Sequence, residues 1–223
     1  KNAPSFHEND TSKWVCTKDH RDGLAGGTLY PSLKKALEFA AANGKTTVYC
    51  PYQGQIPYPL FNGPVTVPPE VRCIRGFDAM LKPPGSDLTH IDVVGNTTEP
   101  LILQDLRFGQ TTLHLQSNRP VVIKRCSIDS IINSPGCGDL FIEDMESIVY
   151  LEHHQKVWMR QFNPERLLNN WQVTRLYTSG AHIWILGLKS EGAGNVITAV
   201  GGAKIELLGT LLYPVVTFSP AMA

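Results

Sequence analysis

The feature that most constrains the fold is an eight-residue pattern that recurs through the middle of the chain. Each copy has apolar residues at its first and third places, then two polar residues and another apolar one. The clearest copies are Leu101-Ile-Leu-Gln-Asp-Leu-Arg-Phe, Val121-Val-Ile-Lys-Arg-Cys-Ser-Ile, Leu140-Phe-Ile-Glu-Asp-Met-Glu-Ser and Val157-Trp-Met-Arg-Gln-Phe-Asn-Pro. Their starts lie 20, 19 and 17 residues apart. A period near 20 built of short strands is typical of a parallel β-helix, whose coils bury their inner faces only against neighbouring coils.

The pattern also predicts which side chains face the core. Strict alternation along one strand would turn the polar fifth residue of each copy inward, so the polar pair indicates a corner between two strands. Segments starting at Trp184 and Ile205 continue the rhythm after spacings of 27 and 21 residues. We therefore expect about eight coils. The side chains expected to face inward are Leu101, Leu103, Val121, Ile123, Leu140, Ile142, Val157, Met159, Trp184 and Leu186.

One segment, residues 32–43, has the pattern of an α-helix. Its apolar residues fall on one helical face, Ser32 is a candidate N-cap, and Gly44 suits the left-handed residue after the helix. The apolar face comprises Leu33, Ala36, Leu37, Ala40 and Ala41. Because the open end of a solenoid exposes apolar core, we expect this helix to cap the first coil.

Other folds explain the repeat less well. A β-sandwich gives no reason for one pattern at near-constant spacing, and a doubly wound α/β fold needs helices between its strands. Leucine-rich repeats would show a recurrent Asn, which is absent. The expected organisation is an N-terminal arm at 1–30, a capping helix at 31–44, a β-helix at 45–214 and a tail at 215–223.

Composition narrows the function. Twenty Lys and Arg balance twenty Asp and Glu, so no net charge attracts nucleic acid or an anionic membrane. No apolar run approaches the roughly 18 residues that span a bilayer. The five cysteines lack the spacing of zinc sites, which predicts no metal of that kind. Cys50 with Cys73, or Cys126 with Cys137, would form bridges in a secreted protein, and buried free thiols are the alternative.

The segment SLKKALEFAAANGKTTVYCP at residues 32–51 resembles the capping helix and first strand of the pectate-lyase-like superfamily of right-handed parallel β-helix proteins. Residues 65–77, VTVPPEVRCIRGF, resemble the next coil, and the similarity extends over about residues 20–214. The resemblance implies a right-handed β-helix, an extracellular location and a polysaccharide partner. It carries over no catalytic residue, because no Asp pair or trio of the family's hydrolases can be matched. The acidic Gly-Asp-Gly and Asp-Asp-Thr motifs that usually open the family's sequences are also reduced here to Asp22-Gly23.

Stacked coils lie about 4.8 Å apart, so equivalent outward side chains form columns. Two corner columns alternate in charge or polarity, which indicates stabilising cross-coil pairs. They are Gln104, Lys124, Glu143, Arg160 and Asp105, Arg125, Asp144, Gln161. A third column is apolar, which predicts cover by the N-terminal arm or by an identical subunit, or sugar stacking by Trp158 and Phe141. It comprises Ile102, Val122, Phe141, Trp158 and Ile185.

A fourth column is polar and is the candidate site, with an ordinary hydrated strand face as the alternative. Glu146 is the candidate acid or base, because a carboxylate must reach the reacting bond. Arg107 and Lys189 would bind substrate carboxylates, and Asn163 would orient the substrate. The column also contains Ser127.

No cofactor is expected, and the adjacent His153 and His154 do not make a metal site because neighbouring strand residues face opposite ways. Oxygen ligands from Glu143, Asp144 or Glu146 would favour Ca²⁺ over zinc if an ion binds. The leading hypothesis is therefore an extracellular carbohydrate-associated protein, with polysaccharide lyase or glycoside hydrolase as its activity. The alternative is a non-catalytic surface, adhesin or tailspike-like module that assembles through the apolar column.

Overall fold

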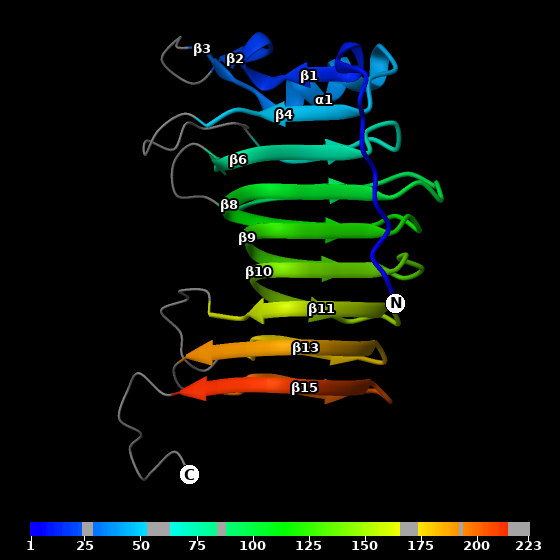
Figure 1. Cartoon of the computed structure of the whole chain (residues 1–223), viewed down its shortest axis with the longest axis vertical. Coiled ribbons are helices and arrows are strands. Elements are labelled where there is room, and N and C mark those ends of the chain that lie inside the picture. The colour runs from blue at the N-terminus through cyan, green and yellow to red at the C-terminus, as the bar shows by residue number, and fades with distance from the viewer. Residues whose placement is uncertain (24–28, 53–62, 84–87, 166–173, 192–193, 214–223) are drawn as a thin grey trace.

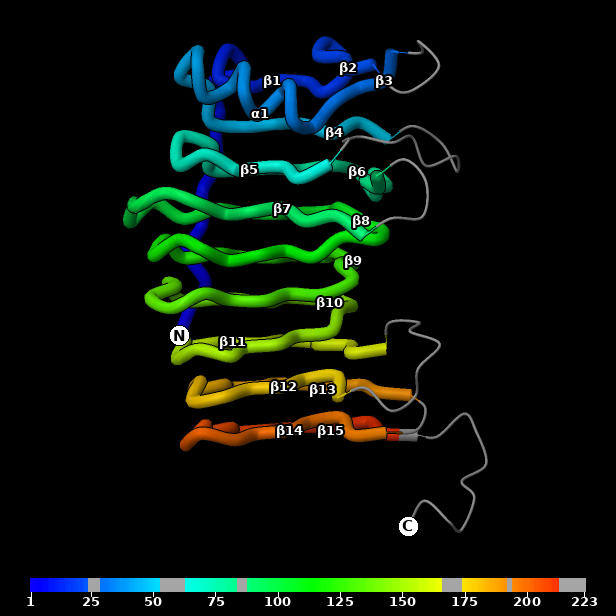
Figure 2. Tube along the Cα trace, turned by 180° about the vertical axis from the view of Figure 1, so that it is seen from behind, coloured from blue at the N-terminus to red at the C-terminus, as the bar shows by residue number. Residues whose placement is uncertain are grey.

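The computed structural model describes residues 1–23, 29–52, 63–83, 88–165, 174–191 and 194–213. Its strands are stacked in tiers along one axis (Figures 1 and 2), in the order β1-β4-β6-β8-β9-β10-β11-β13-β15. Neighbouring strands in this order are parallel. The expected all-β parallel β-helix is confirmed. It has about six turns rather than the eight expected.

The first elements form the N-terminal end of the stack. They are η1 (Thr11–Lys13), β1 (Trp14–Cys16), η2 (Thr17–Asp19), β2 (Arg21–Gly23), β3 (Leu29–Pro31), α1 (Leu33–Ala42), β4 (Thr47–Cys50) and β5 (Val65–Val67). The remaining elements are β6 (Cys73–Leu81), β7 (Thr89–Val93), β8 (Leu101–Leu115), β9 (Val121–Asn133), β10 (Leu140–Leu151), β11 (Lys156–Asn163), β12 (Leu176–Ser179), β13 (His182–Glu191), β14 (Ile197–Val200) and β15 (Lys204–Tyr213).

The capping helix is confirmed. Ser32 precedes α1, and its hydroxyl accepts a hydrogen bond from the backbone N–H of Lys35 at 3.1 Å. Gly44 follows the helix with φ of 60°. The buried face of α1 packs at the N-terminal end of the core (Figure 2), beside β1, β4 and β5. Part of the segment expected to be an arm joins the solenoid here, because β1 pairs with β4.

The strand register confirms the inward residues of four copies of the repeat and corrects the fifth. Val157 pairs with Ile183, so the fifth copy begins at Ile183, one residue before the expected Trp184. Ile183 and Ile185 are buried, whereas Leu186 is 55% exposed. Trp184 and Leu186 therefore do not face the core, and Ile185 does not belong to the apolar column. A one-residue slip moves every side chain of a strand to the opposite face, which is why all three assignments failed together.

The polar pair forms a corner in the four clearest copies, as expected, and Leu186-Gly187 and Leu208-Gly209 take its place in the last two. The second residue of each of these six pairs has a left-handed backbone, with φ between 49° and 81°. These residues are Asp105, Arg125, Asp144, Gln161, Gly187 and Gly209. A single left-handed residue turns the chain sharply while the strands on both sides stay paired with their neighbours.

Of the two alternatives for the cysteines, the structure has free thiols: neither bridge is present, and all five cysteines are free. Cys50 lies opposite Gly76 rather than Cys73 in the sheet, and Cys126 lies opposite Met145. Burial raises the pKa of Cys73 to about 11 and that of Cys126 to about 12. Both therefore fit the alternative of buried, unreactive thiols.

Arg119 holds together the loops at one edge of the solenoid. Its side chain is fully buried and donates to the backbone carbonyls of Val71 at 2.9 Å and Glu99 at 3.0 Å. It also donates to the carbonyls of Pro100 and Pro68. Burial lowers the pKa of Arg119 to about 10, so the guanidinium still carries its charge at neutral pH.

Candidate functional site

The expected polar column exists in register. Arg107 pairs with Ser127 across β8 and β9, and Glu146 lies between Ser127 and Asn163 on β10 and β11. Lys189 has the same place in β13, because the residues before it, Phe162 and Leu188, are partners. Inward-facing neighbours such as Met145 and Phe162 are buried and fix these backbones. The solenoid therefore brings together residues that are up to 82 positions apart in the sequence.

Glu146 lies in a surface hollow of about 350 Å³. Its carboxylate accepts a hydrogen bond from the Ser127 hydroxyl at 3.4 Å. Asp144, two residues earlier, lines the same hollow. Within the described part of the chain, neither Glu146 nor Asp144 forms an ion pair, so both carboxylates can interact with a ligand.

The cations of this hollow are already paired. Arg107 Nε donates to Asp78 at 2.5 Å. Arg125 binds both carboxylate oxygens of Asp105, at 2.5 and 2.9 Å. Three carboxylates and two guanidinium groups line the hollow, and because both guanidinium groups are paired, the carboxylates of Asp144 and Glu146 have no paired cation. Because Arg107 uses only Nε, its two terminal nitrogens remain able to donate to a ligand.

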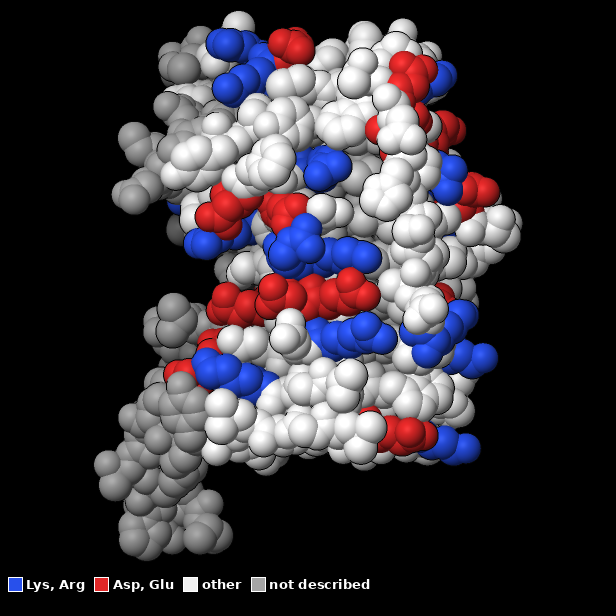
Figure 3. Space-filling view, viewed as in Figure 1, with Lys and Arg blue, Asp and Glu red and all other residues white. Residues whose placement is uncertain are grey.

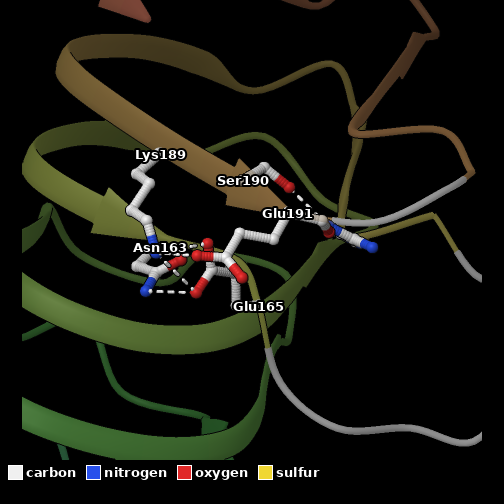
Figure 4. A network of polar contacts seen from close by, with 6 residues as sticks. Asn163, Glu165, Lys189, Ser190 and Glu191 are labelled. Atoms are coloured by element: carbon white, nitrogen blue, oxygen red, sulfur yellow. Dashed lines mark hydrogen bonds and ion pairs between the residues drawn. The ribbon is translucent and has the colours of Figure 1, made fainter. Parts of the chain in front are cut away.

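Lys189 belongs to a separate polar network at the end of the column (Figure 4). Its ammonium group lies 2.8 and 3.0 Å from the carboxylate oxygens of Glu165 and also bonds Glu191. Asn163 donates to Glu165 at 3.0 Å. Hydrogen bonds to Glu165 and Glu191 raise the pKa of Lys189. Lys189 and Asn163 are therefore bonded to acids that the sequence pattern did not single out. Glu165 follows the copy that starts at Val157, and Glu191 is the last residue of the copy expected to start at Trp184.

The corner columns form charged stripes across the face seen in Figure 3. Lys124 on β9 pairs with Glu143 on β10 at 3.2 Å, and Arg125 pairs with Asp105 on β8. The charged side chains of one tier have the same sign, and those of the next tier have the opposite sign. The expected cross-coil pairs are present for these four residues, so they need no ligand to balance their charge.

The apolar column is covered by the N-terminal arm, here residues 1–10. Ala3 and Phe6 pack on a cluster of Cys73, Ile102, Val122 and Phe141, and Figure 1 shows the arm running along the tiers to β11. The arm ends on Lys1, whose ammonium group bonds Asp139 and lies 5.1 Å from the centre of the Trp158 ring. A partner subunit at this column would have to displace the arm.

Trp158 is held in an aromatic stack. Its ring lies 4.9 Å from that of Phe141 and 5.0 Å from that of Trp184, with planes only 14° and 7° apart. Because β11 lies between β10 and β13, these two rings cover opposite faces of Trp158. Trp158 therefore has no free ring face for the sugar stacking predicted there.

The described residues contain no group of three His, Cys, Asp or Glu side chains arranged to hold a metal ion. Of the three acids considered for Ca²⁺, Glu143 is paired with Lys124. Across the same residues, no helix has the length and apolar character needed to cross a membrane.

No protein-family model matches the chain, and neither a curated protein nor a solved structure shows detectable similarity to it. The β-helix architecture is thus shown by the structure itself.

Proposed function

We propose that this protein is a carbohydrate-associated β-helix that binds a neutral polysaccharide along the polar column and hydrolyses it. The observation that carries the proposal is the pair of carboxylates, Glu146 and Asp144, without ion pairs in a hollow that also offers Ser127 and Asn163. Sugars are bound through hydroxyl groups, which both donate to carboxylates and accept from amides and guanidinium groups. As the resemblance implies, we place the protein outside the cell.

The charge of the hollow favours hydrolysis over elimination. A lyase acting on an acidic sugar must stabilise the substrate's carboxylate with cations. Here Arg107 and Arg125 are already bound to Asp78 and Asp105, and the carboxylates of Asp144 and Glu146 remain without a paired cation. A neutral sugar meets no such repulsion.

In the proposed reaction Glu146 protonates the glycosidic oxygen as that bond breaks. Asp144 accepts a proton from the water that attacks the sugar carbon. The two proton transfers balance, and the carboxylates end with their protonation states exchanged. The remaining donors of Arg107 bind sugar hydroxyls.

The test is the release of reducing ends from a panel of neutral and acidic polysaccharides, with unsaturated products measured by ultraviolet absorbance. We expect turnover on a neutral polymer and a loss of at least about 100-fold in kcat for Glu146→Gln and for Asp144→Asn. Glu143→Gln is the matched control, because this acid lies on the same strand and is paired with Lys124. Full activity of Glu146→Gln, or equal losses in all three variants, would contradict the assignment. Unsaturated products from an acidic polymer would establish a lyase instead.

The second candidate, a non-catalytic module that assembles with other copies, is favoured by a different observation. The last described tier exposes several large apolar side chains: Leu207, Leu208, Leu211 and Leu212 on β15. Light scattering tests this candidate. An oligomer with no turnover on any polymer would support the module, and a monomer over a wide concentration range would argue against it.

A further inference from the structure

A column of basic residues lies at the edge where the strands of the last tiers begin. Lys156, His182 and Lys204 are the first residues of β11, β13 and β15 and are register partners. Among the described residues, none of the three side chains forms a hydrogen bond or an ion pair. His154 adds a further imidazole 5.2 Å from that of His182.

This column contrasts with the corner columns of the same solenoid. At the corner, each cation is placed next to an acid on the neighbouring tier. At the edge, two ammonium groups flank an imidazole with no acid between them. Burial, together with Lys204, His154 and Lys156, lowers the pKa of His182. Lys156 and Lys204 lie two tiers apart, on either side of His182, so a bound anion would interact favourably with both ammonium groups and would stabilise the imidazolium form of His182.

Two acids lie near the column. Asp139 lies next to Lys156 on the neighbouring tier, since Leu140 and Val157 are partners, but its carboxylate is already bonded to Lys1. Glu206 lies two residues after Lys204, opposite Trp184, and forms no ion pair within the described chain. These acids lie beside the cations and leave Lys156, His182 and Lys204 without a bonded counter-charge.

The aromatic stack ends beside this column. One face of Trp184 stacks on Trp158, and its other face looks toward β15, where the partner is Glu206. Trp184 and Glu206 line a small hollow together with Arg160 and Lys1. The free ring face can stack on a sugar ring, and the Glu206 carboxylate can accept hydrogen bonds from sugar hydroxyls. His182 lies edge-on to Trp184, with ring centres 6.4 Å apart.

We propose that this edge is a binding site for an acidic polysaccharide, with Lys156, His182 and Lys204 holding its sulfate or carboxylate groups and Trp184 stacking on a sugar ring. Three successive tiers each carry one of these basic residues at the spacing of the strands, so a linear glycan lying along the solenoid axis contacts all three. The free face of the Trp184 ring favours a ligand with sugar rings over a polyanion that offers only charge. The site does not depend on the proposed hydrolysis, because it uses no residue of the polar column.

Calorimetric titration with dextran sulfate and with unsulfated dextran tests the inference, since the two polymers share one backbone. We expect dextran sulfate to bind with the higher affinity. Lys156→Gln and Lys204→Gln should each weaken its binding by up to about fivefold, which is the largest change in affinity that the loss of one exposed ion pair usually causes. Lys124→Gln is the matched control, since Lys124 belongs to a corner column and is already paired with Glu143. An equal loss in Lys124→Gln, or no preference for dextran sulfate, would overturn the proposal.

Two further measurements separate this site from general charge attraction. Trp184→Leu should weaken dextran sulfate binding, whereas Phe77→Leu, at an exposed aromatic residue on β6, should not. Single-stranded DNA that binds as tightly as dextran sulfate, with no effect of Trp184→Leu on either, would show a general polyanion surface instead.

The His182 imidazole provides the pH readout. Because a bound anion stabilises the imidazolium, nuclear magnetic resonance should show the pKa of His182 rising when dextran sulfate binds. Affinity should then increase as the pH falls through that pKa, and His182→Gln should flatten the dependence. An unchanged pKa of His182 at saturating dextran sulfate would place the anion elsewhere.

Discussion

The interior tiers and the last described tier carry similar apolar residues but bury them very differently. Ile123 and Ile142 face the core of β9 and β10 and are fully buried. Leu207 has the same place in β15, through its partner Ile185, and is 38% exposed. At the opposite end, α1 covers the first tier and its Leu37 is 1% exposed. Burial in this solenoid therefore depends on whether a neighbour lies on both sides of a tier, and not on residue type alone.

The largest effect should follow from blocking the close approach of two interior segments. A Cβ atom added to Gly138 would lie 2.3 Å from the backbone oxygen of Asn118 and 2.5 Å from that of Arg119. Backbone cannot move away cheaply, so Gly138→Ala should lower the free energy of unfolding by more than about 4 kcal/mol. Gly209→Ala on β15 is the control, because a Cβ there meets nothing within 4 Å.

At Gly209 the left-handed backbone is the only obstacle to a side chain, and Gly209→Ala should therefore lower the free energy of unfolding by about 1–2 kcal/mol. Urea unfolding of both variants measures the difference. Similar losses for Gly138→Ala and Gly209→Ala would show that the interior is no more tightly constrained than the last tier.

A smaller effect is expected from removing one core side chain at matched positions. Ile142→Ala should reduce the free energy of unfolding by about 2–5 kcal/mol, because it removes buried surface and leaves a cavity. Leu207→Ala should cost less than about 1.5 kcal/mol, since part of that side chain is already in water. Thermal and urea unfolding measure both values. If Leu207→Ala proved as costly as Ile142→Ala, something would cover β15 in solution.

The smallest effect concerns the corner, where interior tiers carry paired charges and β15 carries Leu208 and Gly209. Burial acts to raise the pKa of Asp105, but hydrogen bonds from Arg125 and Gln104 outweigh it and hold the pKa below its ordinary value. The resulting stability is present above the unfolded-state pKa of about 4 and is lost as the pH falls through the lower folded-state pKa.

Asp105→Asn should therefore lower the free energy of unfolding at neutral pH by less than about 1 kcal/mol and reduce its dependence on acid. Unfolding in urea between about pH 2 and pH 7 checks this. Leu208→Ala, at a corner with no charge, should leave the slope with pH unchanged. An identical slope for wild type and Asp105→Asn would mean that the Arg125 pair contributes nothing.

Much of the fold could be predicted because the repeat is local and is written in residue type. The inward residues of four copies, the corners and the capping helix depend on alternation, on polarity and on a Ser and a Gly at the helix ends. The fifth copy failed because Trp184 and Ile183 fit an inward position equally well by hydrophobicity, and only pairing with Val157 selects Ile183.

The candidate site was predictable only as a column. The register of Arg107, Ser127, Glu146 and Asn163 follows from the period, but their partners do not. Asp78 and Glu165 lie at other places in the repeat, and no sequence spacing relates them to Arg107 and Lys189. Lys156, His182 and Lys204 were missed because they precede the repeated segment and become neighbours only after Ile183 is placed correctly.

By itself, the sequence determined that this chain stacks short strands, where it turns and which side of each strand enters the core, since these depend on patterns within about 20 residues. The tertiary structure alone decided that the arm covers the apolar column, that Arg119 joins four loop carbonyls, and which charges meet across tiers. The reason is physical: the hydrophobic pattern can be read within one coil, whereas an ion pair or a covered surface needs atoms from different coils, whose spacing varies from 17 to 33 residues.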